Sequence, residues 1–430
     1  MTKAYKGCFQ QAIIITFLLF WTFHLLLLYA LPDLILLVLL TLLAILYSRM
    51  DWRNSIMLVI SISVVTLVAV SFLKVTGLNH SIFYRPQEMF SVYDVSRNHY
   101  RYEENIDFEM TIAHGDLKLF DNRVTSEPRH VVFQTDSYGF RNTKDFHGQK
   151  YILVGDSFVA GNGISQKDLI TEQLLHFGID SYNLANPGRL SDYINYITNF
   201  EKKYGKEHEF ILFLYEGNDF GRVHSMPVPQ LTSVEEAERY INIRLDRYKK
   251  IWGIENTDIY RFMATYIQRV SYHAKVNDEK VDIQKIRGMD VAFYKPYSLV
   301  SRRTILPEHL NFEKIIAPVQ SRIAHIFFIP TKYRVYYKHS HPLNPCDAEA
   351  LPDQQWEYVQ QVGLKLGIKT TNLTPALIEA SNALLSSKIL TYWKGDTHWN
   401  KYGIATAAKV VFGQLEGDQK RLLRSDHIND

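Results

Sequence analysis

Two long apolar stretches near the N-terminus constrain the fold of this chain more than any other feature of its sequence. Residues 11–47 contain one charged side chain, Asp33, and residues 55–73 contain none. A helix that crosses a bilayer needs roughly 20 mainly apolar residues. Because proline removes a helical hydrogen-bond donor and a carboxylate is costly in lipid, Pro32 and Asp33 should divide the first stretch. The sequence therefore predicts a membrane region, 1–75, with three helices at about 11–31, 33–48 and 55–73.

The charged residues around these stretches predict which side of the membrane the rest of the chain occupies. Lys3 and Lys6 precede the first predicted helix, and Arg49 and Arg53 separate the second from the third. Loops rich in Lys and Arg stay in the cytoplasm, so three crossings leave the remainder of the chain outside it. The segment 33–48 is short for a span, and two crossings with this segment re-entrant or interfacial stay an alternative.

Composition excludes several other classes of protein. The 430 residues are 47% hydrophobic and 22% charged, which is typical of neither a disordered nor a collagen-like chain. The two cysteines, Cys8 and Cys346, are too few for a disulfide framework and form no zinc-binding pattern. Beyond Lys74 the acidic and basic residues are equal in number, so the sequence predicts no basic surface for nucleic acid.

The part after the membrane region divides into a connector and a larger domain. Residues 76–149 mix short extended runs with polar turns, which predicts an irregular or β-rich connector. Over 150–430 strand and helix patterns alternate, and this alternation favours parallel pairing and an α/β fold with a mainly parallel sheet. A tyrosine-rich stretch at about 221–318 is interpreted as an insertion. The predicted strands are 151–154, 182–185, 210–215, 323–329 and 370–373, and the predicted helices are 165–175, 191–204, 348–366, 375–386 and 402–412. Ser165 should cap the first of these helices.

Three residues in two distant segments can form the site of a serine hydrolase. Ser157 ends the sequence Gly155-Asp156-Ser157 after the first predicted strand, and functional groups of parallel sheets gather at the carboxyl ends of strands. Asp396 and His398 precede the last predicted helix, and residues two apart in an extended segment point the same way. Asp396 could then orient His398, which would take the proton of Ser157. The alternative is an ordinary turn and a solvated pair beside a helix start.

Two further residues follow the next two predicted strands and could complete an oxyanion hole. Gly188 follows the second strand, and a glycine lets a backbone N–H approach a substrate closely. Asn218 follows the third strand and offers a neutral side-chain N–H donor. Together with the N–H of Ser157 these donors could stabilise an oxyanion, although each motif alone is an ordinary turn.

In this order the motifs resemble those of the SGNH (GDSL-type) hydrolase family, whose four name-giving residues would be Ser157, Gly188, Asn218 and His398. The resemblance covers about 150–412. It implies a three-layer α/β/α fold, a Ser-His-Asp triad completed by Asp396, and neither a metal nor another cofactor. One residue separates Asp396 from His398, whereas the family usually has two. The form Asp-Thr-His-Trp looks more like membrane-anchored bacterial proteins that O-acetylate exopolysaccharides such as alginate.

The resemblance implies serine-dependent transfer or hydrolysis of an O-acyl group, most simply acetyl, on an envelope or secreted glycan. Its partners would be the glycan or acyl ester, the membrane and a multi-spanning membrane acyltransferase. The chain would lie in the bacterial inner membrane with its catalytic domain on the extracytoplasmic side. A lipid-directed esterase or lipase, or a non-catalytic scaffold of a glycan-modifying assembly, are the alternatives. No residue is assigned to substrate binding. Lys332 and Arg334 are interpreted as rim residues, and binding of an anionic substrate by these two side chains stays the alternative.

Overall fold

The structure is a computed structural model of the chain and describes residues 83–188, 190–220, 276–303, 312–340 and 351–426, with a few single positions elsewhere. Apart from such single positions, the three predicted membrane helices and the insertion up to residue 275 lie outside the described residues. Within the described ranges no helix is both long and apolar enough to cross a membrane. All elements discussed below belong to one compact unit, Tyr84–Ser225 with Val270–Asp430.

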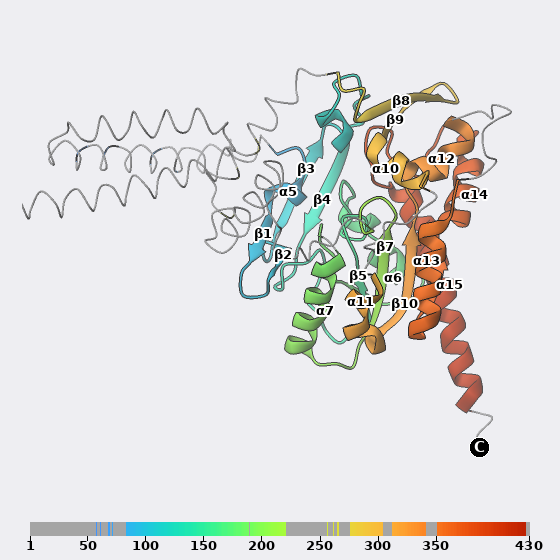
Figure 1. Cartoon of the computed structure of the whole chain (residues 1–430). Helices are drawn as coiled ribbons and strands as arrows, with labels where there is room; N and C mark the ends of the chain where they lie inside the picture. Colours follow the sequence, from blue (N-terminus) through green and yellow to red (C-terminus); the bar gives the residue numbers. More distant parts are fainter. Residues whose placement is uncertain are drawn as a thin grey trace, which may run out of the picture. The chain divides into compact units, whose positions relative to one another are not determined.

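A five-stranded parallel sheet forms the centre of this unit (Figure 1). Its strands, in the order β11-β10-β7-β5-β6, are β11 (Lys369–Asn372), β10 (Ile323–Ile329), β7 (Glu209–Tyr215), β5 (Tyr151–Val154) and β6 (Ser181–Asn183). All of β5 and all but the first residue of β7 are buried. A strand that is covered on both faces needs an unbroken apolar run, which is the pattern found here. The predicted α/β fold with a mainly parallel sheet is confirmed.

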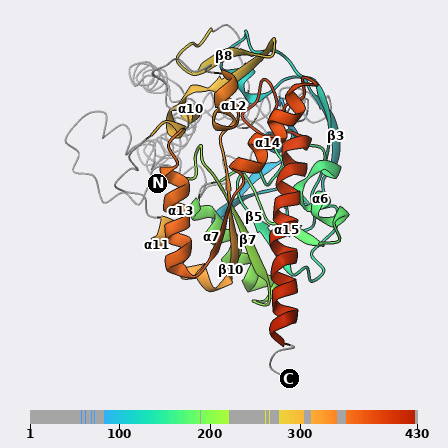
Figure 2. The ribbon, with the colours of Figure 1, turned by 90° about the vertical axis from the view of Figure 1, so that its right-hand side faces the viewer.

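Helices cover both faces of the sheet, and each face has its own apolar core (Figure 2). Because side chains of a strand alternate between the faces, Ile211 and Phe213 enter the first core while Phe210 and Leu212 enter the second. The first core contains α6 (Ile170–His176), α12 (Lys332–Ser340), α14 (Thr374–Leu385) and α15 (Lys401–Asp426), and the second contains α7 (Leu190–Tyr204), α11 (Phe312–Ile316) and α13 (Gln354–Leu366).

Most predicted elements lie within a few residues of their predicted bounds, and β5 and β10 coincide with them. The predicted role of Ser165 is wrong. Its hydroxyl accepts the N–H of Val132 at 3.1 Å, and a short 3-10 helix, η2 (Gln166–Asp168), precedes α6. Two helices differ in length from the predicted ranges 348–366 and 402–412. The first, α13, begins only after Pro352, and the second, α15, continues to Asp426. A residue before proline is disfavoured in the helical conformation, so the later start of α13 follows from its sequence.

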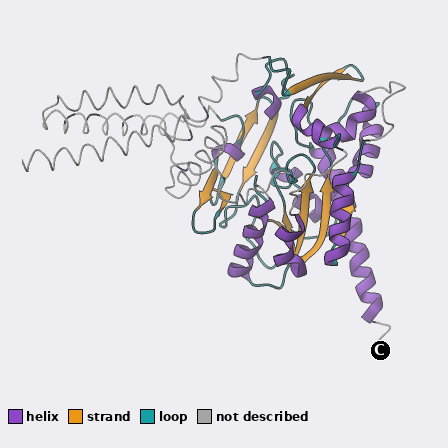
Figure 3. Cartoon of the chain, in the orientation of Figure 1, coloured by secondary structure: helices purple, strands orange, loops and turns teal. Residues whose placement is uncertain are grey.

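The connector contains two antiparallel strand pairs and belongs to the same compact unit as the sheet (Figure 3). The elements are α5 (Pro86–Met89), β1 (Ser91–Asp94), β2 (His99–Tyr102), β3 (Asp107–Ile112), η1 (Asp116–Leu119) and β4 (Arg129–Gln134). Arg141, at the end of the connector, is fully buried and donates to the carbonyl oxygens of Gly161 at 2.6 Å and Ile164 at 2.9 Å. The connector therefore packs against the turn that follows β5.

The described part of the insertion adds a β-hairpin that the sequence analysis did not predict. The strands β8 (Val281–Ile286) and β9 (Met289–Tyr294) pair in an antiparallel register, and α10 (Lys295–Ser301) follows. Arg287 and Gly288 form the two-residue turn with φ of 49° and 80°. Positive φ at both central residues is the requirement of a type I′ hairpin turn, and glycine usually marks the second position. The dipeptide at the turn was therefore a usable signal.

Candidate active site

Ser157 lies in a tight turn at the carboxyl end of β5. The carboxylate of Asp156 accepts the N–H of Phe158 at 2.8 Å and so closes the turn. Gly155 has no room for a side chain, because a Cβ there would lie 2.7 Å from a methyl group of Val159. Parallel pairing places the carboxyl ends of β5, β6 and β7 at one edge of the sheet. The local sequence therefore holds Ser157 at the edge where functional groups of such sheets gather.

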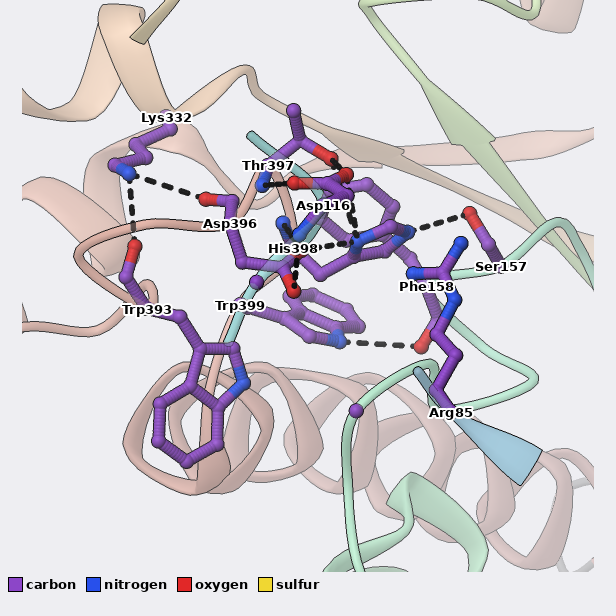
Figure 4. Close-up of polar contacts among 12 residues, drawn as sticks. Arg85, Asp116, Ser157, Phe158, Lys332, Trp393, Asp396, Thr397, His398 and Trp399 are labelled. Carbon is purple, nitrogen blue, oxygen red and sulfur yellow. Dashed lines mark hydrogen bonds and ion pairs between the residues drawn. The ribbon is translucent and has the colours of Figure 1, made fainter. Parts of the chain in front are cut away.

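The side chains of Ser157, His398 and Asp396 form a hydrogen-bonded row (Figure 4). His398 Nε2 lies 2.8 Å from Ser157 Oγ, and His398 Nδ1 lies 2.7 Å from Asp396 Oδ1. Because a carboxylate only accepts hydrogen bonds, Nδ1 carries the ring proton and Nε2 is left to accept the hydroxyl proton of Ser157. The structure thus brings together the three residues that the sequence analysis chose as a triad.

Two contacts beside the row join the segments that carry Ser157 and His398. The indole N–H of Trp399 donates to the carbonyl oxygen of Phe158 at 3.1 Å, and the rings of Phe158 and His398 lie 4.9 Å apart. Asn400 starts the following helix, since its side-chain oxygen accepts the N–H of Tyr402 at 2.9 Å. The helix cap and the indole therefore fix where His398 stands relative to the turn after β5.

Asp396 is fully buried and stays ionised because of its neighbours. Arg129, from β4 of the connector, donates to Asp396 Oδ2 at 2.7 Å, and the backbone N–H of Asp116 donates to the same oxygen at 3.3 Å. Burial alone raises the pKa of Asp396, but the hydrogen bond and charge of His398 and the charge of Arg129 hold that pKa well below its usual range. An ionised Asp396 can stabilise the imidazolium that forms when His398 takes a proton.

Asp116 is a second carboxylate beside His398, and the sequence analysis did not select it. Its oxygens accept the N–H of Thr397 at 2.9 Å and the hydroxyl of Thr397 at 2.5 Å, and its Oδ2 lies 3.7 Å from His398 Nδ1. Burial and the charge of Asp396 raise the pKa of Asp116. The close approach of its segment to Gly395 requires a glycine, since a Cβ on Gly115 would lie 2.2 Å from the carbonyl oxygen of Gly395, but the local sequence does not show this contact.

Arg85 is another connector residue that sequence reasoning missed. Its Nε donates to Glu88 at 3.1 Å, and its guanidinium lies over the ring of Tyr84 at 4.7 Å. Its Nη1 is buried and has no hydrogen-bond partner among the residues that the structure describes. The guanidinium is directed toward the side of Ser157 (Figure 4). A buried unpaired donor at this place can serve an acceptor oxygen of a substrate.

The structure places Gly188 and Asn218 after β6 and β7, the two strands that pair with β5. A Cβ on Gly188 would lie 2.9 Å from the hydroxyl of Tyr196, so a larger residue there would displace that side chain. Asn218 is exposed in a turn that Asp219 anchors by accepting the N–H of Tyr215 at 2.7 Å. Both residues therefore stand at the same sheet edge as the nucleophile turn.

Asp156 gives a second indication of where Asn218 stands. Burial raises the pKa of Asp156 to about 6, while the N–H of Phe158, the charge of His398 and the side chain of Asn218 act in the opposite direction. A side chain that acts on Asp156 in this way lies close to it, and Asp156 directly precedes Ser157. Asn218 therefore approaches the turn that carries the nucleophile.

Lys332 and Arg334 are not rim residues, so that interpretation of the sequence is wrong. Both side chains are buried in the first turn of α12. Arg334 pairs with Glu216 at 2.6 Å and with Asp353 at 2.8 Å, and Lys332 donates to backbone carbonyl oxygens. Their charges are used inside the fold, because a buried charge needs such partners.

Neither the models of protein families nor the curated proteins match this chain. Among the described residues, Asp116, Asp396 and His398 form one group whose ligand atoms lie within 4.8 Å of one another, as a metal site requires. The ion pair of Asp396 with Arg129 supplies the positive charge at this place, so the donor set does not suit a cation. The row from Ser157 to Asp396 suits nucleophilic catalysis instead.

Proposed function

We propose that the chain is an SGNH-type serine esterase or O-acyltransferase that works through an acyl-enzyme. The observation that carries the proposal is the row with Ser157 Oγ and His398 Nε2 2.8 Å apart and His398 Nδ1 and Asp396 Oδ1 2.7 Å apart. A hydroxyl at a strand end, a neutral imidazole and a buried ionised carboxylate are the three parts that an activated serine needs. The parallel sheet with helices on both faces is compatible with the three-layer fold that the motif order implies.

The reaction would proceed in two halves. Ser157 Oγ attacks the acyl carbonyl, its proton passes to His398 Nε2, and Asp396 stabilises the imidazolium. The N–H groups of Ser157 and Gly188 and the side chain of Asn218 would hold the oxyanion. His398 then gives the proton to the leaving alkoxide, and the acyl-enzyme remains. In the second half His398 takes a proton from the acceptor hydroxyl, whose oxygen attacks the acyl carbonyl. The bond between the acyl group and Ser157 Oγ then breaks, and His398 returns the proton to Oγ. Water as the acceptor gives hydrolysis, and a sugar hydroxyl gives transfer.

The proposed substrate is an O-acyl, most simply O-acetyl, ester on an envelope or secreted glycan. The apolar N-terminal stretches and the Asp-Thr-His-Trp form support it, since both are shared with the membrane-anchored proteins that the chain resembles. A membrane partner with many spans would supply acyl groups from the cytoplasm. The placement of the catalytic unit outside the cytoplasm belongs to the same proposal.

Incubation of the purified full chain with an acyl donor and glycan oligomers tests the acceptor. We expect mass spectrometry to find acylated oligomers, and donor consumption should rise as oligomer is added, because a sugar hydroxyl then competes with water for the acyl-enzyme. Donor hydrolysis that oligomers leave unchanged, together with deacylation of a pre-acetylated glycan, would make the protein an esterase. Turnover of long-chain lipid esters alone would favour the lipid-directed alternative.

Reporter fusions test the membrane topology. A fusion after residue 90 should be active only with a reporter that works outside the cytoplasm, because Lys3, Lys6, Arg49 and Arg53 mark the cytoplasmic side of three crossings. A fusion after residue 52 serves as the cytoplasmic control. A cytoplasmic signal from the fusion after residue 90 would contradict three crossings and favour an even number.

A further inference from the structure

Among the described residues, four oxygen atoms lie within hydrogen-bond distance of the Lys332 ammonium group, and all four are backbone carbonyl oxygens. Nζ lies 2.6 Å from Ala292, 2.7 Å from Trp393, 2.8 Å from Lys394 and 3.0 Å from Asp396. An ammonium has three N–H groups, so four acceptors share three donors. Figure 4 shows two of these contacts, to Trp393 and Asp396. The side chain is 4% exposed, which leaves the charge dependent on these carbonyl dipoles rather than on water.

Three of the four carbonyl groups belong to the segment that ends at Asp396. This segment has no helix or strand of its own over 393–396, so its shape depends on contacts from other elements. Besides Lys332, these contacts include Glu127, which accepts the N–H of Lys394 at 2.8 Å, and Leu117, whose N–H donates to Gly395 at 3.2 Å. Carbonyl oxygens that converge on one point repel each other unless a cation lies between them. The Lys332 ammonium lies between these carbonyl oxygens and therefore stabilises the backbone conformation of residues 393–396.

A positive charge at the position of Lys332 lowers the stability of the fold in two ways. Lys332 occupies the first position of α12, where the helix dipole disfavours a positive charge. Burial adds a second cost, which lowers the pKa of Lys332 to about 8, while Asp396, Glu127 and Asp116 act in the opposite direction. The ring of Phe293 in β9 lies 5.4 Å from Nζ. An apolar side chain would avoid both costs, so the cation itself is what the site uses.

We propose that Lys332 is a positioning residue of the active site, whose ammonium acts as a fixed internal cation that shapes residues 393–396. In this way it holds Asp396 where Asp396 Oδ1 lies 2.7 Å from His398 Nδ1. Lys332 acts through Asp396 and His398 and is not itself in contact with the reacting atoms. The inference rests on the proposed function, since it concerns the activation of Ser157.

Labelling with a fluorophosphonate tests the proposed serine mechanism and the role of Lys332 separately, and it needs no knowledge of the natural substrate. The reagent forms a bond to Ser157 Oγ and releases fluoride, so its second-order rate measures how well the row activates the serine. Wild-type protein should label at Ser157. If it does not, the proposed function fails before Lys332 is considered. If wild-type protein labels and Lys332→Met labels at the same rate, the role of Lys332 is wrong.

The variants separate positioning from mere stability. Lys332→Met keeps the length of the side chain without its charge, and we expect it to lower the labelling rate per folded molecule by about 10-fold, as a small misplacement of a catalytic group does. Lys338→Met, on the exposed side of the same helix, should label like the wild type. Lys332→Ala leaves space for a cation, and potassium or methylammonium should restore at least part of the lost rate, because carbonyl oxygens bind such ions. A loss that follows only the folded fraction, with no cation response, overturns the proposal.

The wild-type protein provides a readout that does not depend on the folding of a variant. Labelling should slow as pH rises through about 8, where Lys332 loses its charge. Lys332→Arg, if folded, should shift this decline to higher pH, because arginine stays charged throughout that range. A wild-type rate that is constant or rising from pH 7 to about 9.5 contradicts the positioning role.

Discussion

Replacement of Ser157 with alanine should lower the turnover rate of a short-chain aryl ester by on the order of 10³-fold or more, while the fold stays intact. The hydroxyl oxygen is the atom that would form the acyl-enzyme. Among the described residues, Ser157 provides the one hydroxyl that lies within hydrogen-bond distance of His398 Nε2, at 2.8 Å. Removal of Oγ leaves the turn unchanged, because Asp156 and Phe158 close it through other atoms. Steady-state rates with 4-nitrophenyl acetate measure the effect.

The control for this change is a serine of the same chemistry outside the site. Ser386 is exposed directly after α14, and its hydroxyl donates to the local carbonyl oxygen of Ala383. Ser386→Ala should keep the wild-type rate. Circular dichroism and thermal unfolding should be the same for both variants. Ester turnover by Ser157→Ala within about threefold of the wild type would exclude the serine mechanism and favour a scaffold.

Much of the fold could be predicted because its strands are buried on both faces. Residues 151–154 are an unbroken apolar run, residues 323–329 are a run interrupted only by His325, and a basic residue precedes each. Both became strands, β5 and β10, with the predicted bounds. Strands of this kind leave a signal in the local sequence alone. The hairpin of β8 and β9 carries polar residues at many positions, and its pairing is decided by a turn with positive φ, so periodicity did not reveal it.

The triad could be predicted for a related reason, and its surroundings could not. Ser157, Asp396 and His398 each lie next to an element boundary that the sequence marks, namely a strand end or a helix start. Asp116 and Arg129 reach the same place from the connector, and their contacts with Asp396 span 280 and 267 positions of sequence. Nothing local distinguishes such residues, because only the packing of the connector against the sheet brings them there.

Contacts that only tertiary packing creates also explain why the prediction for Lys332 and Arg334 was wrong. A lysine and an arginine just after a strand were interpreted as rim residues, whereas the structure buries both, which is rare for such residues. Their partners, Glu216 and the carbonyl oxygens of 393–396, belong to other segments. A buried cation is recognisable only when its acceptors are known, and those acceptors come from tertiary structure. The prediction therefore failed at the step from sequence to packing.

Replacement of Asn218 with alanine should lower kcat by about 10²–10³-fold and raise KM far less, because an oxyanion donor acts mainly in the transition state. The turn should survive the change, since Asp219 anchors it through the N–H of Tyr215 and the hydroxyl of Tyr193, which lies 2.9 Å from Asp219 Oδ1. Asn218 itself is exposed, so its loss removes little packing. Rates with a short-chain aryl ester over a range of concentrations separate kcat from KM.

The comparison that interprets this result uses two other variants. Asn382→Ala removes an exposed amide from α14 and should leave both constants unchanged. Fluorophosphonate labelling of Asn218→Ala should still occur at Ser157, but more slowly, because the attack on phosphorus also develops negative charge on oxygen. A wild-type kcat for Asn218→Ala, or a loss that lies in KM alone, would make Asn218 a turn residue. Since Gly188 and Ser157 offer only backbone N–H groups, Asn218 is the one member of the proposed hole that a side-chain substitution can remove, and the hole is therefore tested most directly there.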